Sequence, residues 1–234
     1  MASVTLARRD MLVAGAVAAL ALAARSARVL AAERSAFAWT PLASNQLAAS
    51  FKAVPAGLAT PATTLLSLGG AHRLNGLNNN ATLVSIWADW CVPCLSEMHD
   101  LSTLRERHHR AGFEVIALLQ GSALDVHGAR AKLDELNAKA LPSWIEPRGA
   151  SIAEKLATPP GDKGFTLPCN LLLDRHGWVR ARAFGSHVLA PVEIKNGELT
   201  AKAKQGLPHA STAWSLPAAD SFAQALGAGL LDRL

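Results

Sequence analysis

The order of apolar and polar positions along the chain predicts short strands that alternate with amphipathic helices. The runs 82–87 and 113–119 are mostly apolar, are bounded by turn residues and are too short to be buried helices. Between them, Leu95, Met98 and Leu101 recur at helical spacing, which predicts one apolar helix face. The predicted strands are 63–68, 71–74, 82–87, 113–119, 143–145, 170–174 and 179–183, and the predicted helices are 93–110, 123–138, 151–156 and 218–234.

This order of elements predicts an α/β fold in which a mixed central sheet has helices on both faces. The two late strands are joined by the turn 175–177, which favours a hairpin. Two segments lack clear periodicity. Residues 33–60 are expected to form a linker or loosely packed N-terminal extension, and residues 186–217 an irregular insertion with a small hairpin around 196–197. The expected domain therefore covers residues 61–234.

The first 32 residues have the pattern of an export signal. Arg8 and Arg9 precede a stretch rich in Ala, Val and Leu that reaches residue 24, and small residues follow at 31–32. The paired arginines favour the twin-arginine route of a bacterium, and a general secretory signal is the alternative. An uncleaved N-terminal anchor is a third alternative, although the apolar stretch is short for a membrane span. The sequence thus predicts a periplasmic protein whose leader occupies residues 1–32.

The charge of the chain does not indicate nucleic-acid binding. The formal net charge is +5, but residues 1–32 alone hold four basic residues and one acidic residue. Most of the excess therefore belongs to the leader, and the rest of the chain is close to neutral.

Cys91 and Cys94 form a C-x-x-C pair after the predicted strand 82–87 and at the start of the predicted helix 93–110. Free backbone N–H groups and the helix dipole stabilise a thiolate on the first cysteine. The second cysteine lies one turn along, where it can attack a mixed disulfide formed on the first. Pro93 suits an early helix position because its missing N–H would have no partner there. The spacing therefore predicts a redox-active disulfide, with Cys91 as the attacking thiol and Cys94 as the resolving thiol.

Other interpretations of the cysteines stay open. The pair can be an inert structural bridge, or half of a zinc site that Cys169 and a histidine would complete. Soft thiolates also suit Cu(I), so the alternative function is a copper or zinc carrier that uses the pair with Cys169 or His99. Cys169 is the odd cysteine of the chain. A buried thiol behaves as a small apolar residue, and a third redox-active or metal-binding thiol is the alternative.

The residues around the pair form a longer pattern, made of Trp87, Ala88, Trp90, Cys91, Pro93, Cys94, Glu97, Met98 and Leu101. This pattern resembles the W-A-x-W-C-x-P-C-x-x-E-M-P-x-L motif of the TlpA/ResA/CcmG-like branch of the thioredoxin superfamily. Members of that branch are exported thiol–disulfide oxidoreductases. Residues 167–177 are similar to the second motif of the family, a proline before an apolar strand that ends in Asp and a Gly turn. The resemblance covers roughly residues 60–185 and the last helix.

The resemblance implies a thioredoxin-like fold and an enzyme that exchanges protein disulfides with no cofactor and no bound metal. In the family the proline of the second motif is cis and packs against the dithiol, so Pro168 is the candidate; a trans turn proline is the alternative. Trp90 is expected to shield the dithiol and to contribute to the partner-binding surface, or simply to pack. Glu97 is expected either to handle protons or to be a solvated, helix-stabilising carboxylate.

The implied partners are disulfide-containing exported proteins and a membrane-bound electron donor. Family members serve cytochrome c maturation or the reduction of copper-handling proteins, and the direction of electron flow is left open by the sequence. The chain also departs from its relatives at three positions. Ser85 stands where thioredoxins often carry a buried carboxylate, His99 replaces a helix-kinking proline, and Cys169 replaces a hydroxyl residue after the candidate cis-proline.

Overall fold

The computed structural model describes residues 40–159, 161–187, 194–195, 198–199 and 212–233 of the 234-residue chain. The chain divides into two compact units, Met1–Thr40 and Pro41–Leu234, and the second contains the sheet. The predicted leader at 1–32 lies outside the described residues. None of the helices in the described part has the length and apolar composition of a membrane span.

The strands are β1 (Lys52–Ala59), β2 (Leu65–Ser67), β3 (Gly70–His72), β4 (Ala81–Trp87), β5 (Phe113–Leu119), β6 (Ser143–Ile145), β7 (Cys169–Asp174), β8 (Trp178–Phe184), β9 (Ile194–Lys195) and β10 (Glu198–Leu199). The α-helices are α2 (Gln46–Ser50), α3 (Val92–His108), α4 (Val126–Glu135), α5 (Ile152–Ala157) and α7 (Pro217–Gly227). The 3-10 turns are η1 (Thr40–Leu42), η2 (Leu74–Gly76), η3 (His109–Ala111), η4 (Ala213–Ser215) and η5 (Leu230–Arg233).

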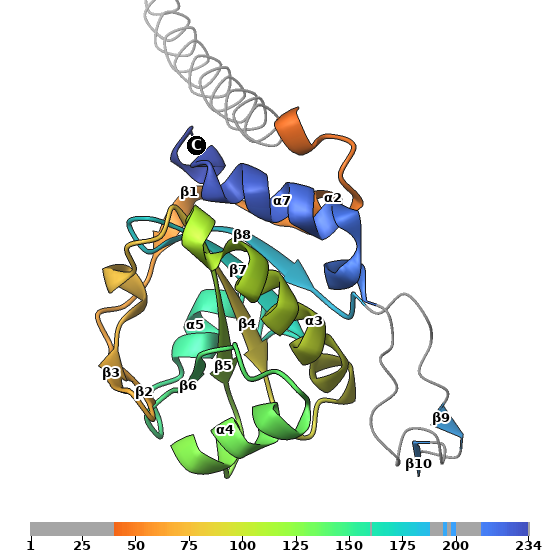
Figure 1. The fold of residues 1–234 in the computed structure, drawn as a ribbon. Coiled ribbons are helices and arrows are strands. Elements are labelled where there is room, and N and C mark those ends of the chain that lie inside the picture. The colour runs from red at the N-terminus through yellow and green to blue at the C-terminus, as the bar shows by residue number, and fades with distance from the viewer. Residues whose placement is uncertain (1–39, 160, 188–193, 196–197, 200–211, 234) are drawn as a thin grey trace, which may run out of the picture. The chain divides into compact units, whose positions relative to one another are not determined.

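One eight-stranded mixed sheet runs in the order β1-β8-β7-β4-β5-β6-β2-β3 (Figure 1). β4 and β5 are parallel, as are β5 and β6, whereas β7 is antiparallel to both β4 and β8. Every residue of β4 is buried, because this strand lies at the centre of the sheet and is covered on both faces. The predicted thioredoxin-like α/β fold with a mixed sheet is confirmed.

Helices cover both faces of the sheet (Figure 1). On one face, Ile152 and Leu156 of α5 pack in a core cluster with Val84 and Ile86 of β4. The alternate residues of β4 point to the opposite face, on which α3 and α7 pack against β5 and against each other. The dithiol helix α3 therefore lies on the face opposite α5.

The expectation of a loosely packed extension over 33–60 is wrong for the part that the structure describes. α2 buries Leu47, and β1 pairs with β8 along the edge of the main sheet. Between them, the ring of Phe51 stacks on that of Phe222 in α7, with 5.3 Å between ring centroids. The compact unit therefore includes α2 and β1 and does not begin at residue 61.

The C-terminal part also differs from the expectation. The helix predicted over 218–234 ends at Gly227, and η5 follows it. Within the expected insertion, Thr212 and Trp214 are fully buried, so residues 212–217 belong to the packed domain. β9 and β10 pair as an antiparallel ladder on either side of 196–197, two residues that lie outside the described part.

Candidate active site

The C-x-x-C pair lies where β4 passes into α3. β4 ends at Trp87, and the backbone N–H of Cys91 donates to the carbonyl of Ala88 over 3.0 Å. Cys91 is the N-cap residue of α3, and its own carbonyl accepts the N–H of Leu95 over 3.0 Å. Pro93 stands in the first turn, where its missing N–H leaves no bond unmade. The dithiol is thus held at the positive end of a helix, which favours a thiolate.

Cys91 and Cys94 are joined as a disulfide, with their Cα atoms 5.3 Å apart. Cys91 is 5% exposed, and Cys94 is fully buried. Trp90 is 66% exposed, and its indole Nε1 donates to the carbonyl of Gly121 over 3.3 Å. Cys91 is therefore the more exposed cysteine of the two, and an exposed aromatic ring stands next to it in the chain.

Pro168 lies at the same edge of the sheet as the dithiol. The Leu167–Pro168 peptide bond is cis. Directly after it, Cys169 in β7 pairs with Ile86 near the end of β4. The Pro168 carbonyl accepts the N–H of Gly185, which follows β8, over 3.0 Å. The ends of β4, β7 and β8 therefore bring this proline and the dithiol to one edge.

Glu97 lies one turn beyond Cys94 on the buried face of α3 and is itself fully buried. Its Oε1 accepts the backbone N–H of His187 over 2.6 Å and lies 3.4 Å from Nδ1 of the same histidine. Its Oε2 is buried and has no hydrogen-bond partner among the described residues. The interpretation of Glu97 as a solvated carboxylate is therefore wrong. The sequence offered no signal for the contact with His187, one of eight scattered histidines.

A protein-family model described as Redoxin matches residues 55–189, which is more than half of the chain and includes Cys91, Cys94 and Pro168. The chain belongs to the Redoxin family. It is a thiol–disulfide oxidoreductase with a C-x-x-C disulfide.

Several solved structures are similar to this redoxin. A putative thiol:disulfide interchange protein DsbE from Chlorobium tepidum is 20% identical, with a TM-score of 0.45 over 64% of this chain and 93% of the other. A thiol:disulfide interchange protein from Bacteroides sp. is 18% identical, with a TM-score of 0.45 over 66% and 91%. StoA from Bacillus subtilis is 16% identical, with a TM-score of 0.42 over 54% and 92%.

Cys169 of this redoxin is a free thiol that faces away from the dithiol helix. It is fully buried and belongs to the core cluster beneath α5, to which α3 contributes nothing. Burial raises the pKa of its thiol to about 12, and the charge of Arg182 opposes part of this rise. The structure does not bring Cys169 together with Cys91 and Cys94, and its surroundings are those of an apolar core residue.

The departures at Ser85 and His99 have different structural outcomes. Ser85 pairs with Asn170 across β4 and β7, and both side chains are fully buried. Their polar atoms have no hydrogen-bond partner among the described residues. α3 continues without interruption through His99, whose Nδ1 lies 3.2 Å from the carbonyl oxygen of Asn137. The described residues hold no group of three or more His, Cys, Asp or Glu side chains that could bind a metal ion.

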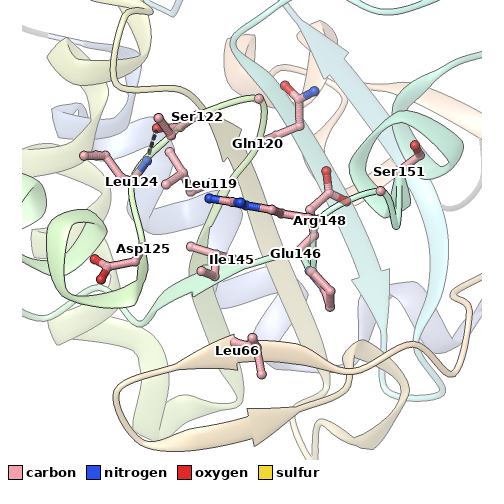
Figure 2. A pocket seen from close by; sticks show the side chains of 14 residues that line it. Leu66, Leu119, Gln120, Ser122, Leu124, Asp125, Ile145, Glu146, Arg148 and Ser151 are labelled. Atoms are coloured by element: carbon pink, nitrogen blue, oxygen red, sulfur yellow. Dashed lines mark hydrogen bonds between the residues drawn. The ribbon is translucent and has the colours of Figure 1, made fainter.

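A cavity of about 410 Å³ opens between the loop after β5 and the loop after β6. Figure 2 shows Leu66, Ile145 and Leu119 on its walls, with the side chain of Arg148 extending across it. Gly121, whose carbonyl accepts the Trp90 indole N–H, also lines the cavity. The hollow therefore borders the loop that supports the exposed tryptophan.

Proposed function

We propose that this redoxin is an exported reductase of disulfides in partner proteins. The observation that carries the proposal is the asymmetry of the dithiol at the start of α3: Cys91 is 5% exposed, whereas Cys94 is fully buried. A partner can therefore form a mixed disulfide with Cys91, while Cys94 is held beneath it.

The first step is attack on the partner. The Cys91 thiolate forms a bond to one sulfur of the partner disulfide, and the partner S–S bond breaks. The other partner sulfur leaves as a thiolate and takes a proton from water. The helix N-terminus stabilises the attacking thiolate in this step, because its free N–H groups point toward the negative charge.

The second step releases the partner. Cys94 gives its proton to a base, and its thiolate attacks the sulfur of Cys91 to close the intramolecular disulfide. The second partner sulfur leaves as a thiolate, so the partner has gained two electrons and the dithiol has lost two. Glu97 is the proposed base: residues three apart on a helix face are neighbours, and its buried Oε2 is unpaired among the described residues.

The same edge of the sheet offers a surface for the partner. Trp90 provides an exposed apolar face, and the backbone after Pro168 continues directly into β7. We expect the partner chain to lie along this backbone while its sulfur meets Cys91. Trp90 and Pro168 are thus proposed to orient the partner and not to react with it.

The leader motif supports a periplasmic location for this chemistry, with twin-arginine export as the proposed route and residues 1–32 as the proposed signal. Because that compartment is oxidising, a membrane-bound dithiol donor must return the two electrons after each cycle. The motif around 87–101 supports a place in the TlpA-like branch, whose partners are proteins of cytochrome c maturation or copper handling.

Reduction of a protein disulfide tests the proposal directly. The reduced wild-type protein should reduce insulin, Cys91→Ser should abolish the reaction, and Cys94→Ser should stop at a mixed disulfide on Cys91. A redox titration should give a potential near that of thioredoxin, about −270 mV. A value near that of DsbA, about −120 mV, would reverse the proposed direction of electron flow.

A further inference from the structure

His187 links the buried Glu97 carboxylate to the protein surface. Its backbone N–H and its ring Nδ1 lie 2.6 Å and 3.4 Å from Oε1 of Glu97. At the other side of the ring, Nε2 lies 3.1 Å from the hydroxyl oxygen of Ser50, which is exposed at the end of α2. A chain of polar groups therefore runs from the carboxylate near Cys94 to solvent.

The hydrogen-bond network fixes where the protons of this chain lie. The Ser50 hydroxyl donates its single proton to the carbonyl of Leu47 over 2.6 Å. Its oxygen must therefore accept from His187, so Nε2 of the ring carries a proton. Nδ1 is buried and makes no hydrogen bond among the described residues, and at 3.4 Å from Oε1 of Glu97 it is attracted to the carboxylate only if it is protonated as well. The arrangement thus suits an imidazolium next to an ionised Glu97.

Packing holds the ring in this place. The imidazole lies 6.4 Å from the Phe51 ring and 4.9 Å from the Trp214 ring, and 7% of the His187 side chain is exposed. Burial of a carboxylate without a positive neighbour costs more solvation free energy than its contacts in the folded protein recover. An imidazolium at this distance offsets part of that loss by its charge.

Most of the other charged groups on the elements around this pair are engaged with other residues. On α7, Asp220 pairs with Arg107 and His108. On β5, Glu114 pairs with Arg105, and η4 carries no ionisable side chain. On α3 itself, Asp100 accepts the N–H and the hydroxyl of Thr212.

We propose that His187 is a positioning residue that keeps Glu97 ionised and oriented to take the proton of Cys94, and that it passes that proton to solvent at Ser50. The proposal rests on the proposed function, in which Cys94 must lose a proton before it resolves the mixed disulfide. The Cys94 proton moves to Oε2 of Glu97, and the imidazolium gives its Nε2 proton to solvent at Ser50, so that the step leaves a neutral carboxyl group beside a neutral imidazole protonated on Nδ1. No electrons move in this relay.

The test isolates the resolving step. A mixed disulfide between Cys91 and thionitrobenzoate is formed in acid, where Cys94 stays protonated, and resolution is started by a jump to neutral pH. His187→Gln and His187→Phe should each slow release of thionitrobenzoate by about tenfold and move its pH dependence to higher pH. His187→Phe keeps an aromatic ring against Phe51 and Trp214, so it separates the polar role from packing. The exposed His127→Gln is the matched control and should resolve as the wild type does.

A double-mutant cycle completes the test. If the histidine acts through Glu97, then His187→Gln should add nothing to the slowing caused by Glu97→Gln. A wild-type rate and pH profile in His187→Phe, or additive effects in the double variant, would overturn the proposal. Formation of the mixed disulfide at the wild-type rate shows that each variant is folded. Release in Cys94→Ser would instead contradict the proposed function.

Discussion

At the scale of single residues, burial decides which thiols can ionise. The pKa of Cys169 is raised from 9.0 to about 12, chiefly by burial. In the oxidised protein the other two cysteines are bonded to each other, so Cys169 is the thiol that titrates. At a pH between about 9 and about 12, the Cys169 thiol is ionised in the unfolded chain but still protonated in the folded one, so the unfolded chain binds fewer protons. The contribution of the protonated Cys169 thiol to the unfolding free energy is therefore complete below about pH 9 and is lost as the pH rises toward about 12.

Comparison of the oxidised wild type with oxidised Cys169→Ala measures this effect. Between about pH 9 and pH 10.5, the wild type should lose about 2 kcal/mol more unfolding free energy than the variant. The chain has no tyrosine, which removes one other source of alkaline titration. Urea unfolding at a series of pH values gives both curves. Parallel curves would show that the ionisation of Cys169 does not change on unfolding.

The sequence predicted the dithiol but not the contact between the buried Glu97 and His187, and the reason is physical. Cys91, Pro93 and Cys94 lie close together in the chain at the start of a helix that they help to form. A motif of a few residues is therefore enough to predict their chemistry. Glu97 and His187 lie 90 residues apart, and only the tertiary packing brings them together. Burial of Glu97 could not be predicted either, because a carboxylate at a helix start is most often solvated.

At the scale of elements, the chain returns onto α3 through η4. Asp100 of α3 accepts the N–H of Thr212 over 3.2 Å and its hydroxyl over 2.7 Å. The same hydroxyl oxygen accepts the N–H of Trp214 over 3.2 Å, and the N–H of Ala213 donates to the carbonyl of His187 over 2.7 Å. The segment that carries His187 is thus tied to η4, and η4 is tied to α3.

Loss of the Thr212 hydroxyl should weaken this tie. Thr212→Val removes a hydrogen bond to a charged group and leaves the Trp214 N–H without its acceptor, so the unfolding free energy should fall by about 2 kcal/mol. Thr212→Ser keeps the hydroxyl and should lose less than half as much. Thr103→Val is the matched control, because the Thr103 hydroxyl only donates to a carbonyl within α3. Equal losses in the two valine variants, measured in urea, would contradict the assignment.

The pattern located the central strands well and missed the edge strand. The predicted range 113–119 coincides with β5, because a strand buried on both faces is a continuous apolar run. β1 contains Pro55 and Gly57, and its register against β8 breaks between Ala53 and Leu58. Gly57 has φ +69°, and a Cβ there would lie 3.0 Å from the Trp178 ring. Such irregularity is tolerated at a sheet edge and hides the strand from a period-two pattern.

At the scale of the whole molecule, the position of α2 and β1 determines where the domain begins. Leu42, Leu47 and Phe51 are all buried, and the Phe51 ring packs against α7. β1 also pairs with β8, the strand that leads to Gly185 and His187. The segment 41–60 therefore contributes to the core, and it also supports the strand that leads to His187, the neighbour of the buried Glu97.

Two truncated chains test this boundary. A chain that begins at residue 41 keeps the whole second unit and should unfold at the temperature of a chain that begins at residue 33. A chain that begins at residue 61 loses three large buried apolar side chains, worth about 5 kcal/mol in total, which is comparable to the stability of a small domain. It also exposes the edge of β8, which is a site for aggregation. Thermal unfolding and the soluble fraction measure both effects, and a stable, monomeric chain 61–234 would show that β1 is dispensable.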